Sequence, residues 1–226
     1  MARLIDRQIC FPLADAVGTA SVPGPLHLAD AHAEALSELL QALACGEESA
    51  VLAFAHFVDS PLEDAARRAL ARIAGEELVH ERLLRGLRCV LPAPEPDKQL
   101  RHALIRFYHH IAQTDLGSHL AAIVALDAAV CWILAALVAP RGVLRQEPTV
   151  AAILHRIHRD EAGHVQLSRR FAAELVRRDA LGAVAESTRL GLVAILAQRG
   201  AAFENLRVDA ARLFADIGRV PDGLFR

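Results

Sequence analysis

The sequence has few aromatic residues, almost no methionine and little net charge. Phe, Trp and Tyr make up 4% of its 226 residues, and one residue is methionine. The formal net charge of −2 lacks the strongly basic signature of nucleic-acid binding. Polar and apolar residues do not alternate for long, so the 54% hydrophobic content, mostly alanine and leucine, favours helices over strands. We therefore predict an all-α protein with no nucleic-acid partner.

Cysteine is also scarce. The chain has four cysteines and no C-x-x-C pair: Cys10, Cys45, Cys89 and Cys131. This spacing excludes a rubredoxin-like or zinc-ribbon module. In a chain of this length we expect free thiols in a reducing compartment rather than a disulfide framework. The N-terminal residues do not form a secretory signal, so we expect a cytoplasmic protein.

One apolar run could also form a membrane-spanning helix. Residues 120–139 contain a single charged side chain, Asp127, and are long enough to span a bilayer. A central helix of a soluble bundle, apolar on all sides, has the same composition. We favour the soluble helix because polar residues recur at matching spacing elsewhere, and we predict no membrane span.

The order of elements predicts one domain over residues 1–226. An irregular arm is expected at 1–25, a bundle at 28–179 and accessory helices outside the bundle at 183–217. Within the bundle, helices are expected at 28–59, 60–90, 119–139 and 148–179, with a crossover helix at 98–113. Ser60 and Pro61 are typical of a helix start, as N-cap and first helical residue.

Two similar motifs dominate the sequence. Glu76-Glu77-Leu-Val-His80 and Asp160-Glu161-Ala-Gly-His164 both read acid-Glu-x-x-His. Residues three apart project from one face of a helix. One further acid precedes each motif: Glu47 lies 30 residues before Glu77, and Asp127 lies 34 residues before Glu161.

All six candidate residues fall on apolar helix stripes, where unpaired charges are costly. Carboxylates and imidazoles suit redox-active first-row metals, and this ligand order is that of a four-helix bundle with a dinuclear centre. The alternative is a salt-bridged bundle core, since a single Glu-x-x-His arises easily by chance. On the first helix, Glu48 is the fallback for Glu47.

The pattern resembles the ferritin-like di-iron carboxylate superfamily. The motifs are closest to those of bacterial multicomponent monooxygenase hydroxylases, ribonucleotide reductase small subunits and arylamine N-oxygenases, over about residues 30–180. The resemblance implies one metal held by Glu47, Glu77 and His80, and a second held by Asp127, Glu161 and His164. It also implies that Glu77 and Glu161 bridge, while Glu76 and Asp160 accept hydrogen bonds from imidazoles across the bundle.

Three residues depart from that pattern. Asp127 replaces the usual glutamate and is one methylene shorter. His158 lies three residues before Glu161, whereas the extra histidine ligand of arylamine N-oxygenases lies four before; a flanking core or surface histidine is the alternative. Tyr108, the single tyrosine, lies outside the four ligand helices, so we expect a packed residue with a solvated hydroxyl and no radical role.

These inferences lead to an expected function. We expect an O2-dependent oxidoreductase that uses two iron ions, or manganese, to hydroxylate, N-oxygenate or desaturate a small organic substrate. Electrons would come from a separate reductase or ferredoxin, and a homodimer is expected. The alternatives are a ferritin-like ferroxidase or iron-handling protein, a peroxide-reducing protein of the rubrerythrin type, and a metal-free helical scaffold. The missing C-x-x-C pairs disfavour the rubrerythrin type.

Overall fold

A computed structural model describes residues 10–11, 23–59, 62–95, 97–112, 115–175, 177–219, 221 and 224–225. All regular structure within these ranges is helical, which confirms the all-α prediction. Most of the arm predicted at 1–25 lies outside the described residues, as do Ser60 and Pro61.

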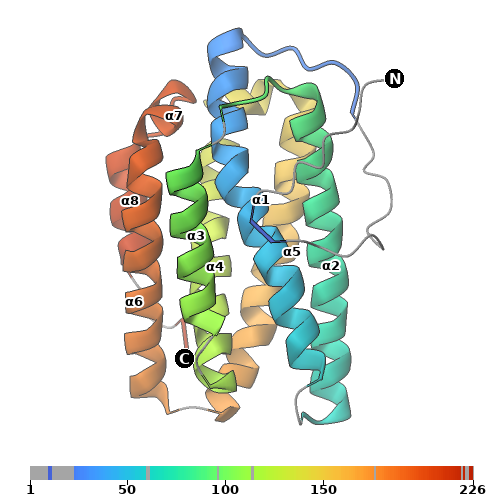
Figure 1. The fold of residues 1–226 in the computed structure, drawn as a ribbon, viewed down its shortest axis with the longest axis vertical. Helices are drawn as coiled ribbons and strands as arrows, with labels where there is room; N and C mark the ends of the chain where they lie inside the picture. Colours follow the sequence, from blue (N-terminus) through green and yellow to red (C-terminus); the bar gives the residue numbers. More distant parts are fainter. Residues whose placement is uncertain are drawn as a thin grey trace.

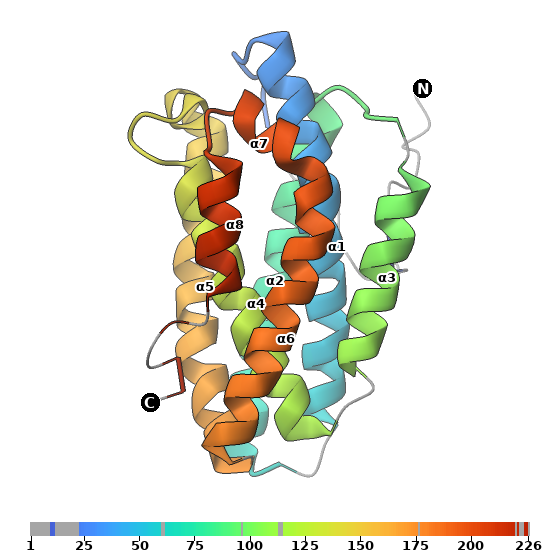
Figure 2. The same cartoon turned by 90° about the vertical axis from the view of Figure 1, so that its left-hand side faces the viewer.

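Two helix pairs enclose the core. α1 (Asp30–Val58) packs against α2 (Asp64–Val90), and α4 (Leu116–Leu137) packs against α5 (Pro148–Leu175). α2 also contacts α5, which joins the two pairs (Figure 1). α3 (Lys98–Ala112) links the pairs and packs beside α1 and α6, as Figure 2 shows. Its bounds agree with the crossover helix predicted at 98–113.

Three ends of the core helices differ from the predicted ones by three residues or more. α2 begins at Asp64, four residues after the predicted start, because residue 63 is still extended (φ −60°, ψ 149°). α4 begins at Leu116, three residues early, because the Asp115 carboxylate accepts a hydrogen bond from the Ser118 amide at 3.0 Å and caps the first turn. α5 ends at Leu175 rather than near residue 179.

The C-terminal helices lie outside the two pairs. α6 (Arg178–Leu196) continues through a short 3₁₀ turn into α7 (Gly200–Asn205), and α8 (Ala210–Gly218) follows. α6 and α8 both pack against α4, so they cover its outer side. The buried guanidinium of Arg189 on α6 donates to the carbonyl oxygens of Ala125 on α4 and Arg219 after α8. α6 begins at Arg178, before the predicted residue 183. It packs directly against the core helix α4, whereas the prediction placed it outside the bundle as an accessory helix.

α4 is buried on nearly every side. Among the described residues, two stretches are long and apolar enough to cross a membrane by length and composition: Leu116–Leu137 (hydropathy 2.4, 67% buried) and Ala180–Asn205 (hydropathy 1.5, 39% buried). The core helix of a soluble protein has the same properties. The absence of a membrane span therefore stays a prediction.

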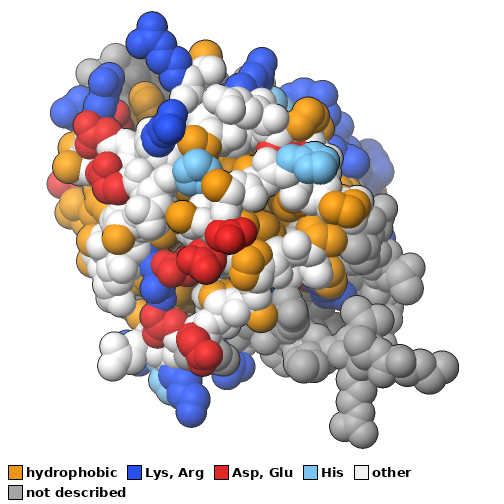
Figure 3. Space-filling view, turned by 90° about the horizontal axis from the view of Figure 1, so that it is seen from above, with side chains coloured by type: hydrophobic (Ala, Val, Ile, Leu, Met, Phe, Trp, Pro, Cys, Tyr) orange, Lys and Arg blue, Asp and Glu red, His pale blue; other side chains and the backbone are white. Residues whose placement is uncertain are grey.

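One end of the bundle shows acidic, basic, histidine and apolar side chains intermixed (Figure 3). A groove of about 690 Å³ lies at this end, where α1 begins and α2 connects to α3. Its wall includes Glu34, Glu38 and Asp97, with Arg199 paired to Asp97. Among the described residues, the donor groups close enough to share a metal ion lie elsewhere, inside the bundle.

Candidate metal centre

Each of the four core helices brings at least one candidate donor into the bundle. Glu77 and His80 lie three residues apart on α2, and Glu161 and His164 lie three apart on α5, so each pair projects from one helix face. α1 contributes Glu47 and α4 contributes Asp127. All six side chains are buried, and none of these residues is more than 6% exposed.

The six residues form two overlapping groups. Within each group, one donor atom from every residue lies within 4.8 Å of the others. The first group is Glu47, Glu77, His80 and Glu161; the second is Asp127, Glu161 and His164. Glu161 belongs to both. The structure therefore brings together all six residues that the sequence singled out, although their role as ligands stays a prediction.

Each motif glutamate presents one oxygen to each histidine. Glu77 places Oε2 3.3 Å from Nδ1 of His80 and Oε1 2.9 Å from Nδ1 of His164. Glu161 places Oε1 3.2 Å from Nδ1 of His80 and Oε2 3.8 Å from Nδ1 of His164. The two imidazole centroids are 5.7 Å apart. Carboxylates that span two imidazoles in this way are positioned to bridge two metal ions.

Among the described residues, three buried atoms at the centre meet no hydrogen-bond partner of good geometry: Oε1 of Glu77, Oδ2 of Asp127 and Nδ1 of His164. The Glu77 and His164 atoms lie 2.9 Å apart and form an ion pair with each other, so the Asp127 oxygen is the one without a polar contact. Buried polar atoms without partners are rare and indicate a missing ion or water. The donor set fits a first-row metal, because its oxygens and imidazole nitrogens converge on one space.

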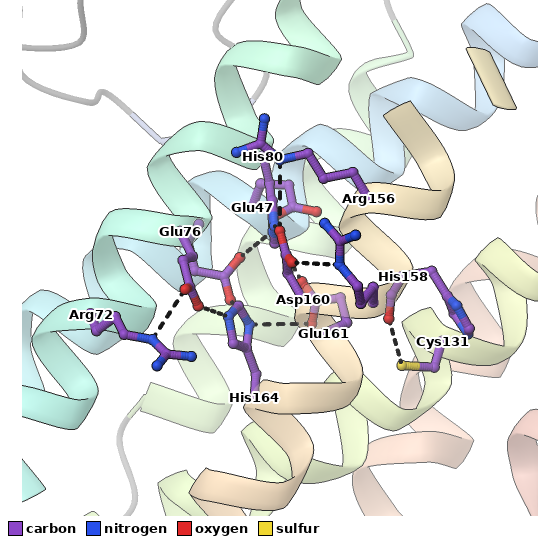
Figure 4. A network of polar contacts seen from close by, with 12 residues as sticks. Glu47, Arg72, Glu76, His80, Cys131, Arg156, His158, Asp160, Glu161 and His164 are labelled. Carbon is purple, nitrogen blue, oxygen red and sulfur yellow. Dashed lines mark hydrogen bonds and ion pairs between the residues drawn. The ribbon is translucent and has the colours of Figure 1, made fainter. Parts of the chain in front are cut away.

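The outer nitrogens of both histidines are held across the bundle (Figure 4). Nε2 of His80 on α2 lies 3.3 Å from the Asp160 carboxylate on α5, and Nε2 of His164 on α5 lies 2.9 Å from the Glu76 carboxylate on α2. An Nε2–H that donates to a carboxylate leaves Nδ1 free to accept a metal. These reciprocal contacts therefore orient both imidazoles with Nδ1 toward the cluster.

Without a metal, the cluster retains protons. Burial raises the pKa of Glu47 to about 8 and raises the pKa of Asp127 well above its usual value, in both cases with help from neighbouring carboxylates. Burial alone would lower the pKa of His164, but its contacts with Glu161 and Glu77 outweigh this and raise it to about 11. Positive charge is thus strongly favoured among these carboxylates, and a metal ion can supply it in place of protons.

Glu48, the fallback for Glu47, and His158, considered as an extra ligand, lie outside both donor groups. The Glu48 carboxylate points away from the cluster and accepts the backbone N–H groups of Cys10 at 3.0 Å and Phe11 at 2.9 Å. The carbonyl oxygen of His158 lies 4.0 Å from the thiol of Cys131. His158 is only half-buried, unlike the six donor residues.

Tyr108 lies closer to the centre than expected. Although α3 is not a ligand helix, the Tyr108 hydroxyl reaches Gly46, where an added Cβ would lie only 3.1 Å from it. Burial, followed by the charges of Glu47 and Asp127, raises the pKa of this hydroxyl. The expectation of a solvated hydroxyl was therefore wrong. The absence of a side chain at Gly46 permits this approach, and a lone glycine in a helix was the only available signal.

A small apolar cavity adjoins the donor groups. It has a volume of about 50 Å³, and Glu47, Glu77, Asp127 and Glu161 form its polar wall. Its other lining residues are largely apolar and come from four helices: Ala42, Leu43, Leu104, Ile123, Leu126, Val130, Ile133, Leu192 and Leu196, with Gly46, Ser49, Ala50 and Tyr108. We call this space the cluster cavity. Leu192 and Leu196 show that α6 contributes to the site, which was not expected of an accessory helix.

Two of the four cysteines are paired, contrary to the expectation of free thiols. Cys10 and Cys45 form a disulfide between Cα atoms 5.4 Å apart, whereas Cys89 and Cys131 are free. The two partners are 35 residues apart, so their proximity depends on tertiary structure that spacing does not reveal. The disulfide removes the argument from reduced thiols for a cytoplasmic location, which stays a prediction.

No family model, no curated protein and no solved structure matches this chain. The resemblance to ferritin-like di-iron proteins therefore rests on the ligand motifs, and membership of that superfamily stays an inference.

Proposed function

We propose that the protein is an O2-activating dinuclear non-haem iron oxidoreductase that acts on a small organic substrate. The observation that carries this proposal is the pair of donor groups sharing Glu161, with an Asp127 oxygen that has no partner among the described residues, beside an apolar cavity. A salt-bridged structural core would not leave the buried Asp127 oxygen without a polar contact. Carboxylate-rich donor sets accept both iron and manganese, and the resemblance favours iron.

The chain would hold and orient two metal ions. Glu77 and Glu161 would span both ions, Glu47 and His80 would complete one coordination set, and the remaining donors would complete the other. Two irons, when bound, supply the electron transfers that O2 reduction needs. Inserting one oxygen atom into a C–H bond consumes O2, two electrons and two protons and releases water, so an external reductase or ferredoxin would supply two electrons.

The cluster cavity would exclude water and admit an apolar group. Its wall beyond the carboxylates is apolar, which suits a hydrocarbon or aromatic portion of a substrate. A tyrosine hydroxyl is protonated at neutral pH, and the raised pKa of Tyr108 makes its ionisation less favourable still, so it can donate a hydrogen bond beside Glu47. Leu192 and Leu196 of α6 line this cavity, so the position of α6 would limit the size of the substrate group that fits.

Metal content and O2 consumption test the proposal together. Protein loaded anaerobically with ferrous iron should bind about two ions per chain and consume O2, and O2 uptake should depend on both a reductant and an apolar substrate. Glu81→Gln is the matched control, because Glu81 is a buried acid on α2 whose carboxylate pairs with Arg85 at 2.6 Å outside the cluster. Absence of bound iron in protein that contains folded helices would reject the proposal.

One observation favours a second candidate, a ferritin-like ferroxidase or peroxide-reducing protein. The cluster cavity, with a volume of about 50 Å³, accommodates a few molecules of the size of water or O2 but not a whole organic substrate. In that case the reductant for O2 or peroxide would be ferrous iron itself. Continued oxidation of many irons per chain without an organic substrate, accompanied by elution as a large cage, would support this candidate over the oxygenase.

A further inference from the structure

A second cavity lies beside the cluster cavity, and two residues line both cavities. It has a volume of about 170 Å³ and is lined by aromatic, imidazole and small residues: Phe11, Ser49, Leu52, Ala53, His56, Tyr108, His109, Ala112 and His119. Ser49 and Tyr108 line both cavities, so they form the partition between them. We call the second cavity the vestibule. Burial, followed by the charge of His56, lowers the pKa of His119 to about 4, so its imidazole is neutral at pH 7.

Phe11 forms one wall of the vestibule and lies against the partition. Its ring meets Tyr108 edge-on at a centroid distance of 6.3 Å and His109 edge-on at 5.6 Å. The Phe11 residue is only 9% exposed. An aromatic ring from the N-terminal part of the chain thus packs on the same tyrosine whose hydroxyl reaches the cluster cavity.

Two independent anchors hold Phe11 there. The disulfide joins the preceding residue, Cys10, to Cys45 on α1, and the Glu48 carboxylate accepts the amide N–H groups of both Cys10 and Phe11. Cys45 and Glu48 are three residues apart, so both project from one face of α1. The short Cys10–Phe11 segment lies beside the middle of α1, in dark blue (Figure 1). Of these anchors, the disulfide is the covalent one.

We propose that the vestibule is the route by which O2 and small neutral molecules reach the cluster cavity, and that disulfide-held Phe11 restricts this route until a dithiol reductant breaks the Cys10–Cys45 bond. Reduction cleaves the S–S bond; the reductant supplies two electrons and two protons, becomes a disulfide itself and leaves two thiols. Phe11 then keeps only non-covalent contacts and can leave Tyr108. The control of a reactive centre rests on the proposed function, whereas the opening of the vestibule does not.

The first experiment follows His119 in metal-free protein. Diethylpyrocarbonate modifies accessible neutral imidazoles, and peptide mass spectrometry gives the rate at each histidine. We expect His119 to react at least fivefold faster in Cys10→Ser/Cys45→Ser and in Phe11→Ala than in the oxidised wild type. Modification of His102, which is exposed on the same helix as Tyr108, should be unchanged and serves as the internal control.

Reductant separates the disulfide from a general loosening of the fold. Treatment with a phosphine should accelerate His119 modification in the wild type and leave the double serine variant unchanged, with circular dichroism confirming that both retain their helices. Equal His119 rates in the oxidised wild type, Phe11→Ala and the double serine variant would overturn the gate. So would a phosphine response that persists without Cys10 and Cys45.

A second measurement tests whether the vestibule leads to the cluster. In iron-loaded protein, oxidation of ferrous iron by O2 should be several-fold faster in the double serine variant than in the oxidised wild type, with the same iron content. If footprinting shows the gate but the oxidation rate does not change, the vestibule is not the route. If no iron binds at all, the proposed function fails while the footprint still decides the gate.

Discussion

The two halves of the candidate metal centre are built differently. On the α2–α5 side, each histidine is held by an acid from the opposite helix, at 3.3 Å for His80 and 2.9 Å for His164. On the α1–α4 side, Glu47 and Asp127 face the cluster cavity, and one Asp127 oxygen has no partner. Both halves line the cluster cavity, but only the first is preorganised by hydrogen bonds across the bundle. We infer that the α2–α5 half fixes the positions of its donors more tightly than the α1–α4 half does.

The largest expected effect comes from the two glutamates that contact both histidines. Glu77→Ala or Glu161→Ala should abolish most metal binding, because each removes a carboxylate that contacts both histidines. Metal analysis after anaerobic loading measures this, with Glu81→Gln as the control. Full loading of both alanine variants would overturn the assignment of these two glutamates as metal ligands.

On the α1–α4 side, Glu47 and Glu48 give a matched pair of adjacent buried acids. Glu47→Gln should lose about one metal ion per chain and abolish O2-dependent turnover, because it removes a donor from one group. Glu48→Gln should retain metal, because its carboxylate binds the amides of Cys10 and Phe11 instead. Iron content and the decay of the O2-generated chromophore compare the two variants. The reverse result would mean that α1 is rotated by one residue.

The outer acids should have a smaller effect. Glu76→Gln and Asp160→Asn keep the size of each side chain but weaken its hold on an imidazole N–H, so metal affinity should fall by about 10–100-fold. Titration with ferrous iron and a competing chelator gives the affinity. Arg72 pairs with Glu76 at 3.1 Å on the outside of α2, so Arg72→Gln is a control that should change affinity much less.

The pH dependence of stability should change sign when metal binds. In metal-free protein, the raised pKa values of Glu47, about 8, and His164, about 11, mean that the folded state binds protons more tightly than the unfolded state. Stability should therefore fall as pH rises from about 5 to 9. Metal must displace those protons, so its affinity, and the stability that it adds, should increase over the same range. Melting temperatures with and without iron test both directions.

The smallest effect is expected at Gly46. An added Cβ would lie 3.1 Å from the Tyr108 hydroxyl, so Gly46→Ala should displace that hydroxyl by a few tenths of an ångström. Iron content should be unchanged, while the rate of reaction with O2 should change modestly. Tyr108→Phe separates the loss of the hydroxyl's hydrogen bonding from the bulk of the added methyl group. If the methyl group alone changes the rate of reaction with O2, Tyr108→Phe should not reproduce that change.

The sequence predicts the α2–α5 half better than the α1–α4 half, for a physical reason. Glu77 with His80 and Glu161 with His164 lie within single helix turns, so helical periodicity alone fixes their common direction. The third core helix, α4, was also recognisable, because Asp127 is the single charged residue in its long apolar run. By contrast, the positions of Tyr108 and the Cys10–Cys45 disulfide depend on how α3 and the N-terminal segment pack on α1, and no local pattern contains that information.

Helix ends were also harder to predict than helix interiors, because they depend on specific hydrogen bonds rather than on periodicity. The start of α4 was misplaced because the capping role of Asp115 depends on a hydrogen bond to Ser118 rather than on apolar periodicity. The direction of Glu48 was predictable as a deviation from the apolar stripe, but its partners were not. Local geometry could therefore be predicted from the sequence, while contacts between distant segments could not.

The reciprocal contacts of the two histidines have a consequence for symmetry. Glu76, Glu77 and His80 recur 84 residues later as Asp160, Glu161 and His164, and exchanging α1–α2 with α4–α5 converts one histidine contact into the other. The centre is thus nearly twofold symmetric along the chain. The symmetry breaks on the cavity side, where Glu47 and Asp127 are 80 residues apart and differ by one methylene. Two identical ions bound there would occupy inequivalent positions, so spectroscopy should distinguish them before any substrate is added.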